Sequence, residues 1–491
     1  MNRLIFLALC LTPLCSPSLL AASPTPSLEL LECRLDRGSR LSTVKARCGQ
    51  LQVAENPEDP NGAQIALAVA RVPSLNIQPE PDPLVILSGG PGQSAIDFYL
   101  GYRGAFEAIR LERDIILMDQ RGTGESNALT CDAVNDISDP GEDDEALKEA
   151  TRACISELNG DPRYYTTSVA VRDLDLLRQA LGTEQWNLYG ISYGTRVAQH
   201  YMRRYPDSTR RVILDGVVHP QLALGPAIST DAQATLDRIF ASCREDTHCN
   251  ERFPDLNETF LNLKQRLKDN PRDIAINDPK TGKLLEQRLS DLELGAVVRL
   301  MSYAPSTIAL LPLIIDSAYG DQNYQPLAAR ARELESTLTE SLSIGMHNAV
   351  VCTEDAPFYE AMTLDLDAIE ATYLGGINYR SIKTMCSEWP QGLLDENFKD
   401  PLETDIPVLL LSGENDPVTP PAYADAAAAG LRNSQHLTGR MQGHGMAPLG
   451  CVPRVMANFI KAESDPLPVS SDCVEDLAVM PFFVDFSGPA E

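Results

Sequence analysis

Short, continuous runs of apolar residues recur in the first half of the chain and again near its end. Such runs are typical of strands that are buried on both faces of a sheet. They lie at residues 84–87, 115–118, 212–214 and 408–411. Further strands are predicted at 186–189 and 435–437, and two opening strands at 50–53 and 65–72. Helical patterns separate most of these runs. This alternation predicts an α/β fold, with a mostly parallel central sheet and helices on both of its faces.

The alternation stops in the middle of the chain. Residues 219–404 have a mostly helical pattern with one hairpin-like break near residues 279–282, and the buried-strand pattern resumes at 408–411. We therefore expect residues 219–404 to form a large, mainly helical lid. This lid is inserted between two parts of one core, which we place at residues 23–218 and 405–491.

The N-terminus has the pattern of a signal peptide. Arg3 precedes an apolar stretch at residues 4–14, and Ala21 and Ala22 provide a small-residue cleavage region. We therefore set residues 1–22 apart from the fold and expect an exported protein, periplasmic or secreted.

The cysteine count agrees with export. The chain has 12 cysteines, and an even set remains when Cys10 and Cys15 are removed with the signal peptide. Exported proteins with even counts favour disulfides over reduced, buried cysteines. Pairing each cysteine with its nearest neighbour, so that each pair brackets one local loop, predicts the bonds Cys33-Cys48, Cys131-Cys154, Cys243-Cys249, Cys352-Cys386 and Cys451-Cys473, the last in a C-terminal tail.

The charge balance is strongly acidic. The chain has 41 Lys and Arg against 69 Asp and Glu, a formal net charge of -28, which argues against nucleic acid and anionic membranes as partners. The apolar stretch 308–315 is short and contains Pro312, so we predict no integral membrane segment in the mature chain. No cysteine or histidine cluster has zinc spacing, and no Lys-Ser/Thr pair follows the glycine-rich turn at 88–92. We expect neither a metal nor an organic cofactor.

A nucleophile is predicted at residues 190–194, where Gly-Ile-Ser-Tyr-Gly has the pattern G-x-S-x-G. The strand before it and the helical pattern after it, at 193–205, distinguish it from a chance match, because a serine on such a turn stands clear of its neighbours. We therefore predict Ser192 as the nucleophile. The oxyanion that its attack creates needs two N–H donors, and we assign these to Tyr193 and to Gly90 of the glycine-rich turn. The alternative for that turn is a plain tight connection.

A serine nucleophile needs a base and an orienting carboxylate. Among six histidines, His444 lies between two glycines beyond the last predicted strand, with His219 as its rival. Asp416 follows the penultimate predicted strand, with Glu414 as the alternative carboxylate. The order Ser192, Asp416, His444 is the nucleophile, acid and base order of α/β hydrolases.

Together these motifs resemble the proline iminopeptidase and tripeptidyl aminopeptidase-like family of α/β hydrolases. The motifs are Ser-Gly-Gly-Pro-Gly at 88–92, Asp-Gln-Arg-Gly-Thr-Gly-Glu-Ser at 119–126, Gly-Ile-Ser-Tyr-Gly-Thr at 190–195, Gly-Glu-Asn-Asp-Pro-Val-Thr-Pro at 413–420 and Gly-His-Gly at 443–445. The resemblance implies the α/β-hydrolase fold and a serine exopeptidase that releases residues from free peptide N-termini through an acyl-enzyme. One departure is Ser88, where many proline iminopeptidases have histidine.

An aminopeptidase must also recognise a substrate ammonium, which a buried carboxylate can bind. The best candidates in the lid are Glu354 and, second, Asp355. The alternative is that they form a solvated acidic pair.

Two other functions stay open. A carboxylesterase or lipase could use the same catalytic residues, and it would lack the amine-binding carboxylate. A non-catalytic α/β-hydrolase-like binding protein would lack a member of the predicted triad, and none is missing here.

Overall fold

The structure, a computed structural model, describes residues 27–36, 43–131, 144–278, 280–464 and 467–490. Its centre is a nine-stranded sheet. The strands are β1 (Leu31–Leu35), β2 (Val44–Ala54), β3 (Gln64–Val72), β4 (Leu84–Leu87), β5 (Ile115–Met118), β6 (Trp186–Ile191), β7 (Thr209–Asp215), β10 (Val408–Gly413) and β11 (Ser434–Gly439). Their order across the sheet is β1-β2-β3-β5-β4-β6-β7-β10-β11. Neighbours from β5 to β11 run parallel, and β1 to β3 extend the sheet with antiparallel pairings. The predicted mostly parallel sheet is confirmed.

Helices cover both faces of this sheet, which explains why β4, β5 and β10 are apolar and buried along their whole length. The helices of the core are α1 (Ala95–Tyr102), α2 (Glu107–Arg110), α4 (Thr167–Ala180), α5 (Tyr193–Arg204), α16 (Pro421–Ala428) and α17 (Val452–Lys461). Leu177 of α4 and Tyr201 of α5 belong to the hydrophobic cluster on one face. Phe98 of α1 and Phe459 of α17 belong to the cluster on the other face.

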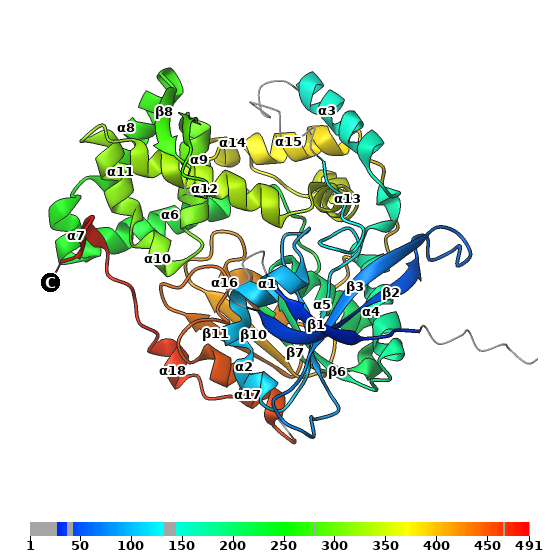
Figure 1. Cartoon of the computed structure of the whole chain (residues 1–491). Helices are drawn as coiled ribbons and strands as arrows, with labels where there is room; N and C mark the ends of the chain where they lie inside the picture. The colour runs from blue at the N-terminus through cyan, green and yellow to red at the C-terminus, as the bar shows by residue number, and fades with distance from the viewer. Residues whose placement is uncertain (1–26, 37–42, 132–143, 279, 465–466, 491) are drawn as a thin grey trace, which may run out of the picture.

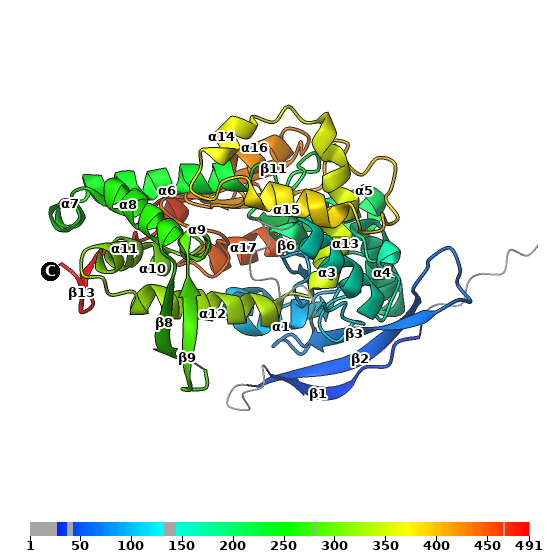
Figure 2. The same ribbon diagram turned by 90° about the horizontal axis from the view of Figure 1, so that it is seen from above.

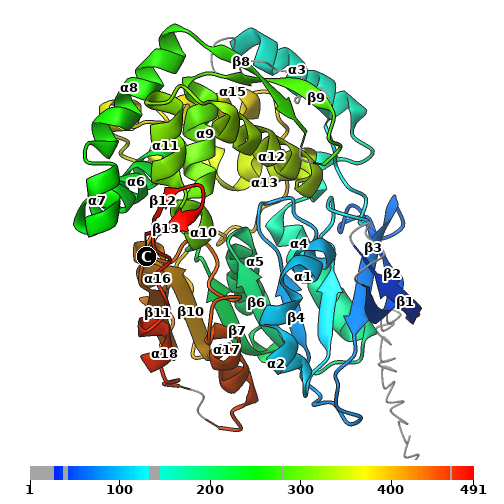
Figure 3. The ribbon, with the colours of Figure 1, turned by 60° about the vertical axis from the view of Figure 1, so that its left-hand side comes forward.

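A mainly helical segment connects β7 to β10, although these two strands are parallel neighbours in the sheet. Its helices are α6 (Ile228–Glu245), α7 (Thr247–Arg252), α8 (Leu256–Asp269), α9 (Asp291–Met301), α10 (Pro305–Ile308), α11 (Leu311–Tyr319), α12 (Gln325–Ser341), α13 (Ile344–Glu354), α14 (Leu366–Glu370) and α15 (Ile377–Cys386). Figures 1 and 3 show this segment, which we call the lid, in green and yellow above the sheet. Most of it has its own hydrophobic core, which includes Phe260 of α8 and Leu294 of α9.

The hairpin-like break in the lid is a two-stranded sheet, β8 (Arg272–Asn277) and β9 (Leu284–Leu289). Its two strands lie side by side at the margin of the lid in Figure 2. Two further segments contact the lid from outside it. Helix α3 (Asp144–Glu157) packs against α15, and Phe483 in the tail strand β12 (Phe483–Asp485) donates its N–H to the Ala309 carbonyl at 2.9 Å. The tail also contains the short helix α18 (Asp472–Glu475) and the strand β13 (Gly488–Pro489).

The sequence pattern missed some boundaries. The helical pattern between the apolar runs 84–87 and 115–118 is divided in the structure into α1, a 3-10 turn at Arg103–Ala105 and α2. Strand β1 was not predicted, because it lies at the sheet edge and only Leu35 in it is buried, so it shows no apolar run. An exposed edge strand lacks the hydrophobic signal on which the prediction depended.

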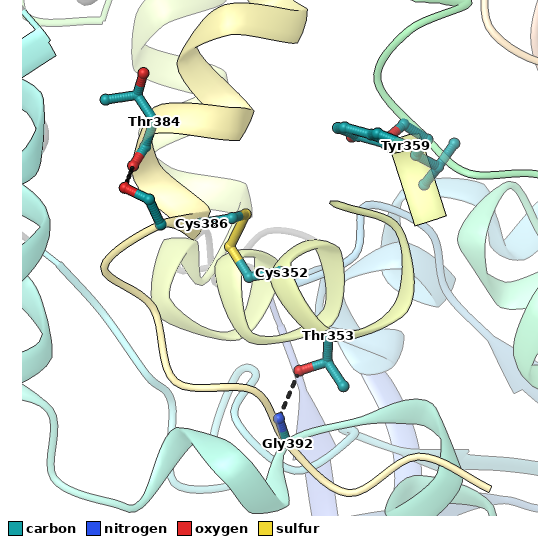
Figure 4. The surroundings of a disulfide bond; sticks show 8 residues. Cys352, Thr353, Tyr359, Thr384, Cys386 and Gly392 are labelled. Atoms are coloured by element: carbon teal, nitrogen blue, oxygen red, sulfur yellow. Dashed lines mark hydrogen bonds between the residues drawn. A yellow bond between two sulfur atoms is a disulfide. The ribbon is translucent and has the colours of Figure 1, made fainter. Parts of the chain in front are cut away.

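The five cysteine pairs named above are bonded in the structure. Figure 4 shows the bond from Cys352 to Cys386, which joins α13 to α15. Beside it, the Gly392 N–H donates to the Thr353 hydroxyl at 2.9 Å, so α13 is tied to the segment that follows α15. The predicted signal peptide, residues 1–22, lies outside the described residues. Across the described ranges, no helix is both long and apolar enough to cross a membrane.

Candidate active site

Ser192 occupies the turn between β6 and α5. Its backbone has φ 54° and ψ -124°, an unusual conformation that aims a serine away from both the strand and the helix. The turn is tight enough to require glycine on both sides. A side chain at Gly190 would come within 2.4 Å of the Gly194 carbonyl oxygen, and one at Gly194 within 2.2 Å of the Leu87 carbonyl oxygen. The G-x-S-x-G spacing therefore has a direct steric reason here.

His444 and Asp416 form a hydrogen-bonded pair. His444 lies in the loop after β11, and its Nδ1 is 2.7 Å from Oδ2 of Asp416, which follows β10. The backbone N–H groups of Val418 and Thr419 donate to the other carboxylate oxygen, each at 2.9 Å. The Thr419 hydroxyl donates to Asp416 Oδ2 at 2.7 Å and lies 3.2 Å from His444 Nδ1. These contacts fix the ring, so that its Nε2 is the nitrogen left for chemistry.

The end of β7 brings the serine and the histidine loops together. The Ser192 N–H donates to the Asp215 carbonyl at 2.9 Å. The Asp215 carboxylate accepts the Met446 N–H at 2.8 Å and the Ala447 N–H at 2.8 Å, just beyond His444. A side chain at Gly216 would lie 3.0 Å from His444 Cε1. Asp215 and Gly216 therefore lie between the two loops and hold both in position. Sequence analysis did not identify this role.

Tyr303 of the lid holds the histidine from above. Its carbonyl accepts the His444 N–H at 2.8 Å, and its ring meets the imidazole edge to face with centroids 5.2 Å apart. The lid is therefore part of the site, because it holds the loop that carries His444 in place.

The pKa shifts keep the pair ready for proton transfer. Burial lowers the pKa of His444, but the charge of Asp416 and its hydrogen bond outweigh burial, so the pKa lies above the usual 6.5. Burial raises the pKa of Asp416, but the charge of His444 and the hydrogen bonds from His444 and Thr419 outweigh it, so the pKa lies below the usual 3.8. Asp416 is therefore ionised at neutral pH and stabilises the protonated imidazole.

The two residues expected to supply oxyanion N–H groups, Tyr193 and Gly90, lie in two neighbouring turns. Tyr193 is the first residue of α5, and the first N–H groups of a helix have no partner within it. Gly89 lies directly against the nucleophile, since a side chain there would come within 3.2 Å of Ser192 Cβ. The expected second donor, Gly90, is the next residue of the same turn, with φ 106°.

Glu354 and Asp355 are fully buried at the end of α13. Glu354 accepts the Thr167 N–H at 2.7 Å and the Thr167 hydroxyl at 2.9 Å. Asp355 is bound by Arg196 of α5, with Nη1 at 3.0 Å and Nη2 at 2.8 Å, and faces Lys399 at 3.3 Å. Burial raises the pKa of Asp355, but the charges of Arg196 and Lys399 outweigh it and the net shift is downward. These contacts tie the lid to the core, and they favour an internal ion cluster over the solvated pair considered above.

The rival side chains are engaged elsewhere. The ring of His219 packs against Tyr423, with centroids 5.5 Å apart. Glu414 Oε2 accepts the Met441 N–H at 2.9 Å, so this carboxylate closes its own loop and does not orient His444. Within the part of the chain that the structure describes, no group of three His, Cys, Asp or Glu side chains could hold a metal ion.

Comparison with known proteins supplies an independent view. The family described as alpha/beta hydrolase fold matches residues 82–281, and the family described as TAP-like protein matches residues 375–471. Together these matches cover the nucleophile turn and the histidine loop.

Three curated relatives bear on the chemistry. The serine protease Hip1 of Mycobacterium tuberculosis is 32% identical over 209 residues, which cover 39% of this chain and 40% of the relative. The tripeptidyl aminopeptidase of Streptomyces lividans is 31% identical over 191 residues, covering 35% and 36%. Carboxylesterase B of Mycobacterium tuberculosis is 29% identical over 225 residues, covering 42% and 43%. The chain thus spans less than half the length of these relatives.

Proposed function

We propose, on the premise that this chain belongs to the α/β-hydrolase fold family, that it is a serine hydrolase with Ser192 as nucleophile, His444 as base and Asp416 as acid. The observation that carries the proposal is the buried Asp416–His444 hydrogen bond of 2.7 Å. The Asp215–Gly216 segment lies next to this pair and also holds Ser192. A nucleophile, a base and an orienting carboxylate from three strand ends are what acyl transfer needs.

The mechanism follows from the placement of each group. His444 Nε2 accepts the hydroxyl proton as Ser192 attacks the substrate carbonyl, and the resulting imidazolium is stabilised by Asp416. The N–H groups of Tyr193 and Gly90 bind the oxyanion. The imidazolium then gives its proton to the leaving group, which departs and leaves an acyl-enzyme. Water, deprotonated by the same histidine, hydrolyses that ester and restores the free serine.

Within this chemistry we propose an aminopeptidase that acts on peptides with free N-termini. The family match described as TAP-like protein and the relatives named serine protease and tripeptidyl aminopeptidase support this choice. The five disulfides support export, to the periplasm or beyond. The relative named carboxylesterase B favours the second candidate, an esterase that uses the same triad.

Binding of a substrate ammonium would require a carboxylate at the cleft. Glu354 and Asp355 remain candidates from the sequence, although their contacts favour a structural role. Asp231 of α6 is a half-buried third candidate. Thr235, one turn later on the same helix, donates to the Asp416 carbonyl at 3.2 Å, so this face of α6 borders the triad. Burial raises the pKa of Asp231 to about 6.

The deciding experiment compares short peptide amides that carry a fluorogenic C-terminal leaving group, with free and with acetylated N-termini, beside a short acyl p-nitrophenyl ester. The proposal expects cleavage of the free peptides, with loss of at least roughly tenfold in kcat/KM on acetylation, because a charge-assisted hydrogen bond is lost. Cleavage of the ester alone would move the assignment to an esterase.

The same assay locates the amine-binding group. We expect Asp231→Asn to lower kcat/KM for free peptides by roughly tenfold and to leave acetylated peptides within about twofold, because only the free ammonium contacts the carboxylate. Glu354→Gln and Asp355→Asn are the matched variants. A loss confined to free peptides in either of these would assign amine binding to the end of α13. An equal loss on free and acetylated peptides would indicate structural damage.

The pH profile of kcat/KM tests the base. Because His444 must be neutral to accept the serine proton and its pKa is raised, activity should fall as the pH drops through a value above 6.5. The acid limb should persist in Glu414→Gln, which leaves the His444–Asp416 pair intact. A profile that stays flat well below pH 6 would contradict the assignment of His444.

A further inference from the structure

The lid contains a pocket that takes no part in the triad. It has a volume of about 340 Å³ and lies between α9 and the segment from the end of α14 into α15. One wall is the face of α9 that carries Leu292, Ala296 and Arg299, and the other carries Leu374 and Ile377. The lining is mainly apolar, and its charged side chains are Arg299 and the acidic pair Asp291 and Glu293.

Arg299 has no acidic partner among the described residues. Its Nε is buried without a hydrogen-bond partner there, and its guanidinium lies over the Tyr303 ring. The acidic side chains of the same wall are occupied, since Glu293 caps its own helix through Ser290 and Asp291 faces Lys264 at 3.8 Å. In a chain with a net charge of -28, an arginine without an acidic partner is unusual, and its guanidinium could bind an external carboxylate.

Tyr373 also lines this pocket. Tyr373 is only 5% exposed, and its hydroxyl has no hydrogen-bond partner among the described residues. Its ring is fixed by Phe260, with centroids 5.8 Å apart. A buried hydroxyl is costly unless it is hydrogen-bonded, so a ligand that accepts its proton would satisfy it.

Tyr303 connects Arg299 of this pocket to His444. The Arg299 guanidinium lies 5.9 Å from the centroid of the Tyr303 ring, and the Tyr303 carbonyl and ring both contact His444. In the proposed mechanism His444 protonates the leaving group. A leaving group that departs past Tyr303 would reach the side of the site where Arg299 lies.

We propose that this pocket binds a carboxylate of the substrate on the leaving-group side, with Arg299 and Tyr373 as the binding residues. The carboxylate belongs either to the free C-terminus of a short peptide or to an acidic side chain there. This inference rests on the proposed function, because it takes its direction from the leaving group. The preferred substrates would then be short peptides with a free C-terminus or peptides with an acidic residue on the leaving-group side.

The test measures binding to the Ser192→Ala variant, so that no turnover intervenes. Isothermal titration calorimetry compares one short peptide as its C-terminal acid and as its amide, and a second pair of amides with Glu or Gln as the last residue. We expect one acidic member to bind at least about tenfold tighter than its neutral counterpart, since a charged hydrogen bond in a buried site has this magnitude. The first pair identifies a C-terminal carboxylate, and the second a side chain.

Variants of the pocket then decide the assignment. Arg299→Gln in the Ser192→Ala background should abolish the acid preference, and Arg299→Lys should retain part of it, because lysine keeps the charge without the planar fork. Tyr373→Phe should lower the preference several-fold. The matched control is Arg288→Gln, an exposed arginine on β9 of the same lid, which should keep the preference.

Two outcomes overturn the proposal: equal affinity for acid and amide in both pairs, including no measurable binding of either, or an acid preference that survives Arg299→Gln. Failure of the proposed function looks different. If the protein binds peptide acids through Arg299 but hydrolyses only esters, the pocket proposal stands and the peptidase assignment is wrong. If it hydrolyses peptides with no acid preference, the peptidase assignment stands and the pocket proposal is wrong.

Discussion

Replacing Ser192 by alanine should lower kcat by roughly 10⁴-fold to 10⁶-fold, because in the proposed mechanism Ser192 is the group that forms the acyl-enzyme. The fold should not change, because alanine is smaller than serine and the two glycines that permit the turn, Gly190 and Gly194, are unchanged. The residual rate comes from the oxyanion N–H groups and from substrate binding. The measurement is kcat of the purified variant, at a substrate concentration far above KM.

The matched control for this prediction is Ser387→Ala, an exposed serine at the end of α15 whose hydroxyl donates to the Thr384 carbonyl at 2.6 Å. It should keep the full rate. If the Ser192 variant retained more than about a hundredth of the activity, the acyl-enzyme mechanism of the triad would be wrong for this chain.

Replacing Asp416 by asparagine should lower kcat by roughly 10⁴-fold, although the side chain keeps its shape. The amide nitrogen can donate to His444 Nδ1, which then carries no proton, so the proton moves to Nε2 and the ring cannot accept one from the serine. The loss of charge also removes the stabilisation of the imidazolium. Because Asp416 is fully buried and bonded at 2.7 Å, neither effect is screened by solvent.

Glu414→Gln is the control for Asp416→Asn, because it tests the other carboxylate that could orient His444. Glu414 is two residues away on the same loop and was the other carboxylate that the sequence allowed. Its Oε2 accepts the Met441 N–H, which a glutamine oxygen can still accept, so we expect activity within about threefold. A large loss in Glu414→Gln together with a small loss in Asp416→Asn would reverse the assignment of the acid.

The sequence predicts the triad because each of its members follows a strand that the sequence pattern predicts. Ser192, Asp416 and His444 come after β6, β10 and β11, and the carboxyl ends of parallel strands lie at one edge of a sheet. The role of Asp215 was not visible in the same way. It depends on β7 lying between β6 and β10, an order that the apolar runs do not encode.

The lid shows where local patterns stop being informative. The spacing of charges gave no sign that Asp355 pairs with Arg196, because the two residues lie 159 positions apart and meet only when α13 packs on α5. The pocket of Arg299 and Tyr373 has the same origin, since α9 and the segment before α15 are joined only by packing. Helical periodicity predicted that these segments are helices, but it did not predict which faces would meet.

The central claim is that Ser192 is an activated nucleophile, and covalent labelling tests it most directly. The mature protein is treated with a fluorophosphonate probe, and the intact mass and the modified peptide are then measured by mass spectrometry. The account predicts one probe per chain, attached to the peptide that contains Ser192, no labelling of Ser192→Ala, and strongly slowed labelling of Asp416→Asn. A native, folded protein that stays unlabelled, or that carries the probe on another residue, would contradict it.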